Sequence, residues 1–268
     1  MIIPPKLSVG DKIGIISTAR KISLEELKPS IEILESWGLE VVFGKFLFGE
    51  ENQFSGTIKH RASDLQSMID DDTINAILCS RGGYGTVQII DEIDFSNLRN
   101  KLKWVIGYSD VTVLHSHLNQ IGYATLHATM PINFSKNTQQ SLLSLNKSLF
   151  GFENIIEHST HKFNRLCKVS GEIVGGNLSI LYSLLGSESD VNTDGRILFI
   201  EDLDEYLYHI DRMLINMRRN GKFRNLRAMI IGSMREMNDN EIPIGKRVDE
   251  IIFDYIKDYD FPGCFNFP

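Results

Sequence analysis

Short apolar runs alternate with amphipathic segments through the first half of the chain, and this pattern restricts the fold more than any other feature. We expect strands at 12–17, 39–43, 75–80, 104–108 and 123–127. Continuous apolar runs of this length are typical of strands buried on both faces of a sheet. Strands that alternate with helices predict an α/β fold with an N-terminal, doubly wound and mostly parallel sheet, whose ligands lie at the carboxyl ends of its strands.

Amphipathic helices are expected between these strands. Ser23 and Glu26 form a capping box ahead of a helix that stops at Gly38. Further helices are expected at 58–69, through Val87, Ile90 and Ile93, and at 110–120.

A change of composition divides the chain. Residues 136–165 are rich in Ser, Asn, Thr and Lys, so we interpret them as a linker that contains one helix near 142–150. Residues 1–135 then form an N-terminal α/β domain and residues 166–268 a C-terminal β/α domain. In the second domain we expect strands at 168–174, 196–200 and 228–231, and helices at 177–185, 206–217 and 248–256.

The composition argues against several classes of function. The net charge is −7 and no block of Lys or Arg is present, which is unfavourable for binding nucleic acid. Cys79, Cys167 and Cys264 lack the spacing of a zinc site or a disulfide framework, as expected in a reducing cytoplasm. We expect no signal peptide, no membrane-spanning run, and no metal or other cofactor.

The stretch 103–115 carries the strongest candidate for chemistry. An apolar run ends in Gly-Tyr-Ser-Asp at 107–110, and an amphipathic segment follows. A serine at such a strand–turn–helix junction presents its hydroxyl above the sheet, as in a nucleophile elbow. Gly107 matches the first glycine of G-x-S-x-G, whereas Val111 stands where the second would be. A plain helix N-cap is the alternative role for Ser109.

Two other strand ends carry candidate groups. The segment Arg-Gly-Gly-Tyr-Gly at 81–85 follows a strand, and its glycines let backbone N–H groups approach an anion; a tight turn is the alternative. Glu201 and Asp202 follow the strand at 196–200, where a carboxylate can orient a histidine. An acid placed at a helix N-terminus by the helix dipole is the alternative there.

A serine nucleophile needs a base, and the histidines offer no obvious one. His115 and His117 lie on the helix after Ser109, His127 ends a neighbouring strand, and His209 lies on the helix after Glu201. Each is by itself more typical of a structural or surface histidine.

Four motifs, in the same order along nearly the whole chain, resemble those of the LD-carboxypeptidase family of serine peptidases. They are Ser-Arg-Gly-Gly-Tyr-Gly at 80–85, Ile-Gly-Tyr-Ser-Asp at 106–110, Gly-Glu-Ile-Val-Gly-Gly-Asn-Leu-Ser at 171–179 and Phe-Ile-Glu-Asp at 199–202. The resemblance implies an N-terminal α/β domain, a swivelling C-terminal β/α domain and a homodimer.

The resemblance also assigns roles to single residues. It implies Ser109 as the nucleophile and Glu201 as the acid of a Ser-His-Glu triad. It implies an oxyanion hole built from the backbone N–H groups of Gly83 and Asp110. Asn177 is then a candidate contact to the substrate, and so is Arg81.

Two positions depart from the family pattern. The family histidine belongs to a Gly-His pair just after a segment like Phe-Asn-Phe-Pro at 265–268, and the 268 residues contain no such pair. We therefore expect a truncated or degenerate chain, truncation being preferred. We also expect impaired activity, because loss of a triad member lowers rates by about 10⁴–10⁶. His-Ala-Thr-Met-Pro at 127–131 replaces a His-Gly-Pro that is common in relatives.

Three functions are compatible with the resemblance. The favoured one is a cytoplasmic LD-carboxypeptidase that releases the terminal D-alanine from muropeptide tetrapeptides in cell-wall recycling. The second is a hydrolase of the same family that gives immunity to a peptide-nucleotide antibiotic, although the added aromatic loop of such relatives is not evident. The third is a non-catalytic muropeptide-binding protein.

Overall fold

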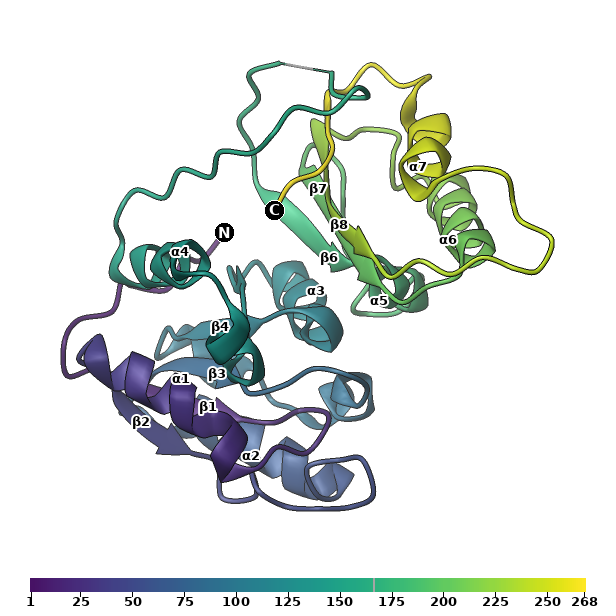
Figure 1. Cartoon of the computed structure of the whole chain (residues 1–268). Coiled ribbons are helices and arrows are strands. Elements are labelled where there is room, and N and C mark those ends of the chain that lie inside the picture. The colour runs from purple at the N-terminus through teal and green to yellow at the C-terminus, as the bar shows by residue number, and fades with distance from the viewer. Residues whose placement is uncertain (166) are drawn as a thin grey trace. The chain divides into compact units, whose positions relative to one another are not determined.

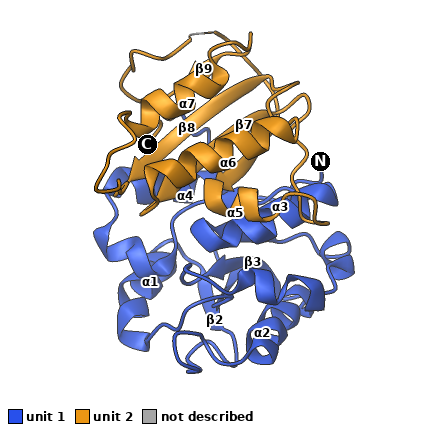
Figure 2. Ribbon diagram, turned by 90° about the vertical axis from the view of Figure 1, so that its right-hand side faces the viewer, with its two compact units in different colours: residues 1–155 blue, residues 156–268 orange. Residues whose placement is uncertain are grey.

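The computed structural model describes residues 1–165 and 167–268 (Figure 1). These residues form two compact units, 1–155 and 156–268 (Figure 2). The division falls inside the segment 136–165. Residue 166, the expected start of the C-terminal domain, lies outside the described residues.

Unit 1 is built on a five-stranded parallel sheet in the order β2-β1-β3-β4-β5. The strands are β1 (Lys12–Ile16), β2 (Glu40–Phe43), β3 (Ile74–Cys79), β4 (Trp104–Gly107) and β5 (Leu126–His127). This confirms the α/β fold with a parallel sheet. The strand order reverses between β1 and β3, which is where ligands of such sheets bind.

Helices cover both faces of this sheet. They are α1 (Leu24–Ser36), α2 (Ile58–Asp70), α3 (Thr112–Gln120) and α4 (Gln139–Phe150). Leu34 of α1 and Leu149 of α4 are buried in the same cluster as Ile13 and Ile15 of β1. Gly14 points to the other face, where a Cβ atom would lie 2.5 Å from the sulfur of Met68 in α2.

The capping box is confirmed, since Ser23 and Glu26 make both of its hydrogen bonds at the start of α1. The helix expected through Val87, Ile90 and Ile93 is wrong. Short 3₁₀ turns occupy Thr86–Gln88, Ile90–Glu92 and Ser96–Arg99 instead. The β-branched side chains of this segment weaken helix formation.

Strand β5 is shorter than expected because the residues before it contact the N-terminus. Ala124 N–H donates to the Ile2 carbonyl, and Ile2 forms an isolated bridge with Tyr123. The Tyr123 hydroxyl is buried and bonds to the backbone of Lys103.

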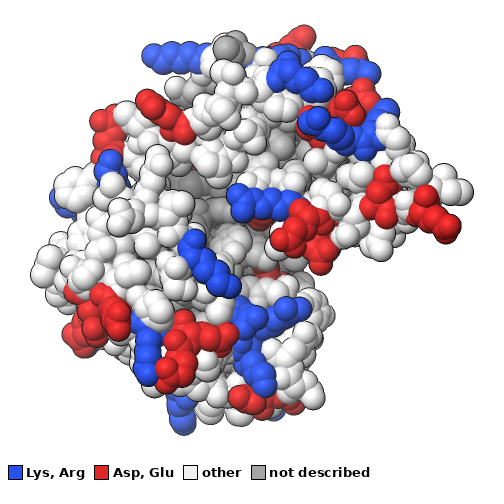
Figure 3. Space-filling view, viewed as in Figure 1, with Lys and Arg blue, Asp and Glu red and all other residues white. Residues whose placement is uncertain are grey.

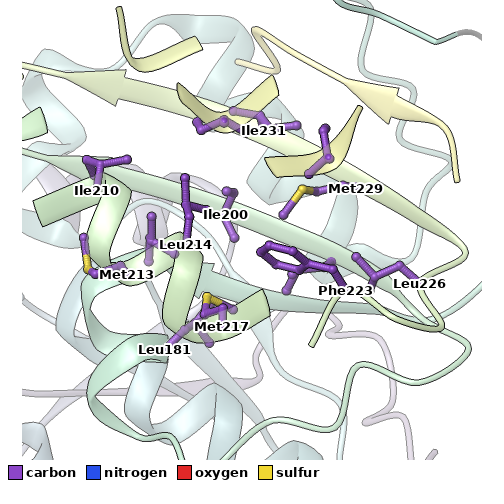
Figure 4. Packing of buried hydrophobic residues seen from close by; sticks show 14 of the residues in the cluster. Leu181, Ile200, Ile210, Met213, Leu214, Met217, Phe223, Leu226, Met229 and Ile231 are labelled. Atoms are coloured by element: carbon purple, nitrogen blue, oxygen red, sulfur yellow. The ribbon is translucent and has the colours of Figure 1, made fainter. Parts of the chain in front are cut away.

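Unit 2 has a four-stranded parallel sheet in the order β6-β7-β8-β9. Its strands are β6 (Ile173–Asn177), β7 (Ile197–Leu203), β8 (Ala228–Arg235) and β9 (Gly263–Cys264), and its helices are α5 (Leu178–Ser183), α6 (Leu207–Arg219) and α7 (Val248–Ile256). The first strand begins later than expected and runs through the Gly-Gly-Asn segment. Ile200 and Ile231 of the sheet share a core with Leu214 and Met217 of α6 (Figure 4).

The surface carries both signs of charge. Figure 3 shows acidic and basic side chains interspersed on the face in view. Within residues 1–165 and 167–268, no helix combines the length and the apolar character needed to cross a lipid bilayer.

Candidate active site

Ser109 stands at the junction between β4 and α3 in an unusual backbone conformation. Its φ angle is +60°, in the left-handed region, while Tyr108 before it is extended. A non-glycine residue in this region is strained by about 1–3 kcal/mol and persists only when its surroundings enforce it. Ser109 opens a 3₁₀ turn ahead of α3, and the N-cap positions of these two helices belong to Tyr108 and Val111. A strained residue between a strand and a helix is the backbone arrangement that the predicted nucleophile elbow requires.

The incomplete match to G-x-S-x-G has a steric explanation. A Cβ atom added to Gly107 would lie only 2.8 Å from a methyl carbon of Val111. Because Gly107 has no side chain, there is room for Val111 at the position of the second glycine.

The glycine loop (residues 81–85) lies directly against Ser109. A Cβ atom on Gly82 would be 3.2 Å from both Cβ and Oγ of Ser109. Gly83 and Gly85 have φ angles of +117° and +146°, which glycine adopts far more readily than other residues. The structure thus brings together the two strand ends that the sequence singled out in unit 1.

Asp110 and Arg61 form a buried polar connection beneath this loop. The Asp110 carboxylate accepts a hydrogen bond from the Thr86 backbone N–H at 2.8 Å. Arg61 donates to the backbone carbonyls of Thr18 and Gly85 at 2.8 and 2.9 Å. Burial raises the pKa of Asp110, and the hydrogen bonds from Thr86 and the charge of Arg61 oppose this rise.

Sequence reasoning missed Arg61. The available signal was its place four residues before Leu65, which puts it on the buried face of α2 together with Ala62. A cation on an apolar helix face needs partners, and those partners come from segments distant in the sequence.

Arg81 is directed to other groups. Its guanidinium donates to the Lys21 carbonyl at 3.3 Å and lies 3.6 Å from a carboxylate oxygen of Glu26. The side chain is one-third exposed, at 33%. It is therefore held at the start of α1.

Two histidines of unit 1, the buried His115 and the half-buried His127, lie beside the end of β4. Nε2 of His115 donates to the Gly107 carbonyl at 2.9 Å, so Nδ1 accepts from the Thr125 hydroxyl at 2.7 Å. Burial lowers the pKa of His115 to about 4. Burial and the neighbouring His115 lower the pKa of His127 to about 3. Both imidazoles are therefore weak bases.

In unit 2, Asp202 is a structural carboxylate. It accepts hydrogen bonds from the Asn177 side chain at 2.8 Å and from the backbone N–H groups of Ser179 and Leu203, both at 2.9 Å. Asn177 is the N-cap of α5 and accepts from the Ile180 N–H at 3.1 Å. Asp202 and Asn177 thus fix the start of α5 after β6.

Glu201 has a different environment. It pairs in register with Asn177 across β6 and β7, and it lies at the register shift between Ile200 and Asp202 in the pairing of β7 with β8. Among the described residues, its buried Oε1 has no hydrogen-bond partner. Burial, together with the neighbouring charge of Asp202, raises the pKa of Glu201 to about 7, although a hydrogen bond from Asn177 opposes the rise. Raised values of this kind often mark functional carboxyl groups.

Close strand contact makes this arrangement possible. A Cβ atom on Gly175 would lie 1.9 Å from the Phe199 carbonyl oxygen, so only glycine lets β6 approach β7 here. The candidates therefore form two groups: Ser109, Asp110 and Gly83 in unit 1, and Glu201 with Asn177 in unit 2. In the described part of the chain, no three or more His, Cys, Asp or Glu side chains are placed to hold a metal ion.

Family models match both units. The LD-carboxypeptidase N-terminal domain matches residues 13–128, and the LD-carboxypeptidase C-terminal domain matches residues 170–268. The chain belongs to the LD-carboxypeptidase family. Membership places the protein among hydrolases of the peptidase class.

Named relatives agree with this assignment. The chain is 31% identical over 272 residues to a probable murein peptide carboxypeptidase of Bacillus subtilis (strain 168), covering 94% of this chain and 81% of that protein. It is 26% identical over 246 residues to a murein tetrapeptide carboxypeptidase of Pseudomonas aeruginosa, covering 87% and 80%.

Solved structures share the fold. The microcin C7 self immunity protein MccF, in complex with aspartyl sulfamoyl adenosine, has a TM-score of 0.85 at 23% identity, covering 100% of this chain and 90% of that one.

Proposed function

We propose that this LD-carboxypeptidase family member is a cytoplasmic serine carboxypeptidase that releases the terminal D-alanine of muropeptide tetrapeptides in cell-wall recycling. The observation that carries the proposal is the left-handed Ser109 at the end of β4, with Gly82 packed against its hydroxyl. The murein carboxypeptidase names of the relatives support the substrate class.

In this proposal Ser109 Oγ attacks the carbonyl carbon of the scissile peptide bond. The backbone N–H groups of Gly83 and Asp110 then bind the oxygen that becomes negative. Loss of one such donor typically costs about 10²–10³ in kcat. Water hydrolyses the resulting acyl-enzyme after D-alanine leaves.

Glu201 orients the histidine that moves the proton between Ser109 and the leaving amine. Its unpartnered Oε1 and raised pKa suit an acid that awaits a positively charged imidazolium. Asn177 and Arg81 are kept as candidate substrate contacts, in addition to the structural hydrogen bonds that each one makes.

We propose that the base is none of the histidines at 1–268. In unit 1, His115 and His127 have lowered pKa values, His60 stacks on Phe46 and His117 packs beside Phe95.

In unit 2, His158, His161 and His209 contact Cys264, Asp249 and Glu205, respectively. In this proposal the base is the histidine of a Gly-His pair, as the family resemblance implies.

Release of D-alanine from a purified muropeptide tetrapeptide tests the proposal. The protein translated to its own stop codon is assayed, with Ser109→Ala as the inactive reference. Turnover that depends on Ser109 supports the proposal. Hydrolysis of a peptide-nucleotide conjugate instead, or muropeptide binding without turnover by the fully translated protein, would support one of the two other functions. Sedimentation tests the homodimer that the family implies.

A further inference from the structure

We propose that the buried side chains of Arg61 and Asp110 are positioning residues, which hold the glycine loop at the distance from Ser109 that its backbone N–H needs to bind the oxyanion. This inference rests on the proposed function, because it concerns the same site. It adds two side chains that act through the loop and do not touch the substrate.

Arg61 fixes the end of the loop to the end of β1. Its side chain is only 1% exposed and reaches Thr18, Gly85 and Gln88, the last at 2.8 Å. Both carbonyls accept from Nη1, whose two N–H bonds have fixed directions in the guanidinium plane, so the arginine sets the separation of the two carbonyls. A Cβ atom on Gly85 would lie 2.5 Å from the Arg61 guanidinium, so glycine is needed there for the arginine to reach the loop.

Asp110 fixes the loop from the opposite side. Its backbone follows Ser109 directly, and its carboxylate holds the N–H of Thr86, the residue after the loop. One residue therefore supplies a proposed oxyanion donor and also a tether to the segment that carries the other donor. The hydroxyls of Thr18 and Thr86 lie 2.8 Å apart and strengthen the same connection.

The two side chains also stabilise each other electrostatically. Burial lowers the pKa of Arg61, and the charge of Asp110 opposes that change. The charge of Arg61 similarly opposes the rise in the pKa of Asp110. Removal of either partner leaves the other as a buried charge with less compensation.

A loop that contains three glycines has little stiffness of its own. Oxyanion donors must lie about 2.7–3.1 Å from the developing charge, and a displacement of about 1 Å can cost about 10²-fold in rate. The external tethers at Gly85 and Thr86 therefore control the chemical step more strongly than they control binding.

Lys103 offers a matched control next to the same strand. It is also a fully buried cation, at 0% exposure, and it donates to the backbone carbonyls of Met68 and Asp71 at the end of α2. It precedes β4, whereas Ser109 follows β4, so the whole length of the strand lies between them.

The experiment compares Arg61→Met, Arg61→Lys, Asp110→Ala and Lys103→Met in the protein translated to its own stop codon. D-alanine release is measured at a temperature at which circular dichroism shows each variant to be folded. Arg61→Met and Asp110→Ala should lower kcat about 10²-fold and change KM less than about threefold, because transition-state contacts are lost. Arg61→Lys should recover part of kcat, because an ammonium group can donate to one of the carbonyls. Lys103→Met should lower Tm and leave kcat within about twofold.

Unchanged kcat in folded Arg61→Met and Asp110→Ala would overturn the inference, and so would a rise in KM alone. If Arg61→Met does not fold, Arg61→Lys and Asp110→Ala decide, since Asp110→Ala keeps its backbone N–H. Ser109→Ala distinguishes a failure of the proposed function from a failure of the positioning role. An active Ser109→Ala enzyme contradicts the proposed function, whereas an inactive one beside active Arg61 and Asp110 variants contradicts only the positioning role.

Discussion

Asp110 in unit 1 is a buried acid and Glu201 in unit 2 is a half-buried one, both near the carboxyl ends of parallel strands, yet their neighbours carry opposite charges. Asp110 lies within the field of Arg61 and binds a backbone N–H. Glu201 lies beside a second carboxylate, Asp202. Each of the two acids keeps one buried oxygen without a hydrogen-bond partner among the described residues, so the neighbouring charge is what distinguishes them. The neighbouring charge therefore makes Asp110 a compensated acid and Glu201 an acid suited to pair with a cation.

The largest effect is expected at Ser109, which directly precedes Asp110 in the chain. Ser109→Ala removes the hydroxyl and keeps the left-handed backbone strain, whereas Ser109→Gly removes both. Each variant should lower kcat/KM by about 10⁴-fold or more. Ser109→Gly should exceed Ser109→Ala by about 1 kcal/mol in the free energy of unfolding, because glycine adopts the φ of +60° at little cost. D-alanine release and urea unfolding measure the two effects, and equal stability of the pair would show that the elbow is unstrained.

The next test separates adjacent acids in unit 2. Glu201→Gln should lower kcat about 10²–10⁴-fold with little loss of folding stability, because an amide orients an imidazole in the wrong tautomer. Asp202→Asn should instead lower Tm, because it disturbs three hydrogen bonds that fix the start of α5. Kinetics and thermal unfolding are recorded for both variants. The reverse pattern would exchange the roles assigned to the two acids.

The pH dependence of stability sharpens the comparison further. The pKa of Glu201 rises from its ordinary value of 4.5 to about 7 in the folded protein. The folded state then binds the proton more tightly, so this group makes the free energy of unfolding fall as the pH rises from about 4.5 to about 7, by at most about 3 kcal/mol.

Urea unfolding of the wild type and of Glu201→Gln, at both ends of that pH range, isolates this contribution. The wild type should lose stability relative to the variant as the pH rises. A relative gain would mean that a positive group holds Glu201 ionised in the folded protein.

The smallest effect is expected at Gly82. Gly82→Ala places a methyl group 3.2 Å from Ser109 Oγ and from the Met130 methyl carbon, which is tighter than ordinary contact. We expect about a tenfold loss of kcat with little change in Tm, because the hydroxyl or the loop must shift by a few tenths of an ångström. Gly171→Ala is the control in unit 2, where the nearest atom belongs to the flexible side chain of Arg227 at 3.3 Å. Equal rates for the two variants would contradict close contact between the loop and Ser109.

Local patterns were enough to predict much of this architecture. Apolar runs and the capping box at Ser23 have causes within a few residues, and most strands of the two sheets follow from them, although β5 and β6 begin later than expected. The segment after Gly85 was misassigned because its apolar residues fit a helical period. Its N-terminal N–H at Thr86 is bound by Asp110 instead, and several of its side chains are β-branched.

Local sequence patterns also identify only part of the candidate site. Ser109 and the glycine loop could be identified from motifs, since each follows its own strand. Arg61 could not, because its partners lie 43 and 24 residues away along the chain. The different roles of Glu201 and Asp202 could not be predicted from the sequence either, because they depend on the register shift in β7.

The last strand of unit 2 is anchored by residues from the beginning of that unit. Arg165 binds the carbonyls of Ile256 and Tyr259 through its side chain and that of Gly263 through its backbone N–H at 3.0 Å. Asn164 accepts from the N–H of Phe265 at 2.7 Å. During synthesis on the ribosome, unit 1 has all of its strands before residue 156 emerges. Unit 2 has to wait for about a hundred further residues before its first segment finds its partners, and so it depends longer on protection from aggregation.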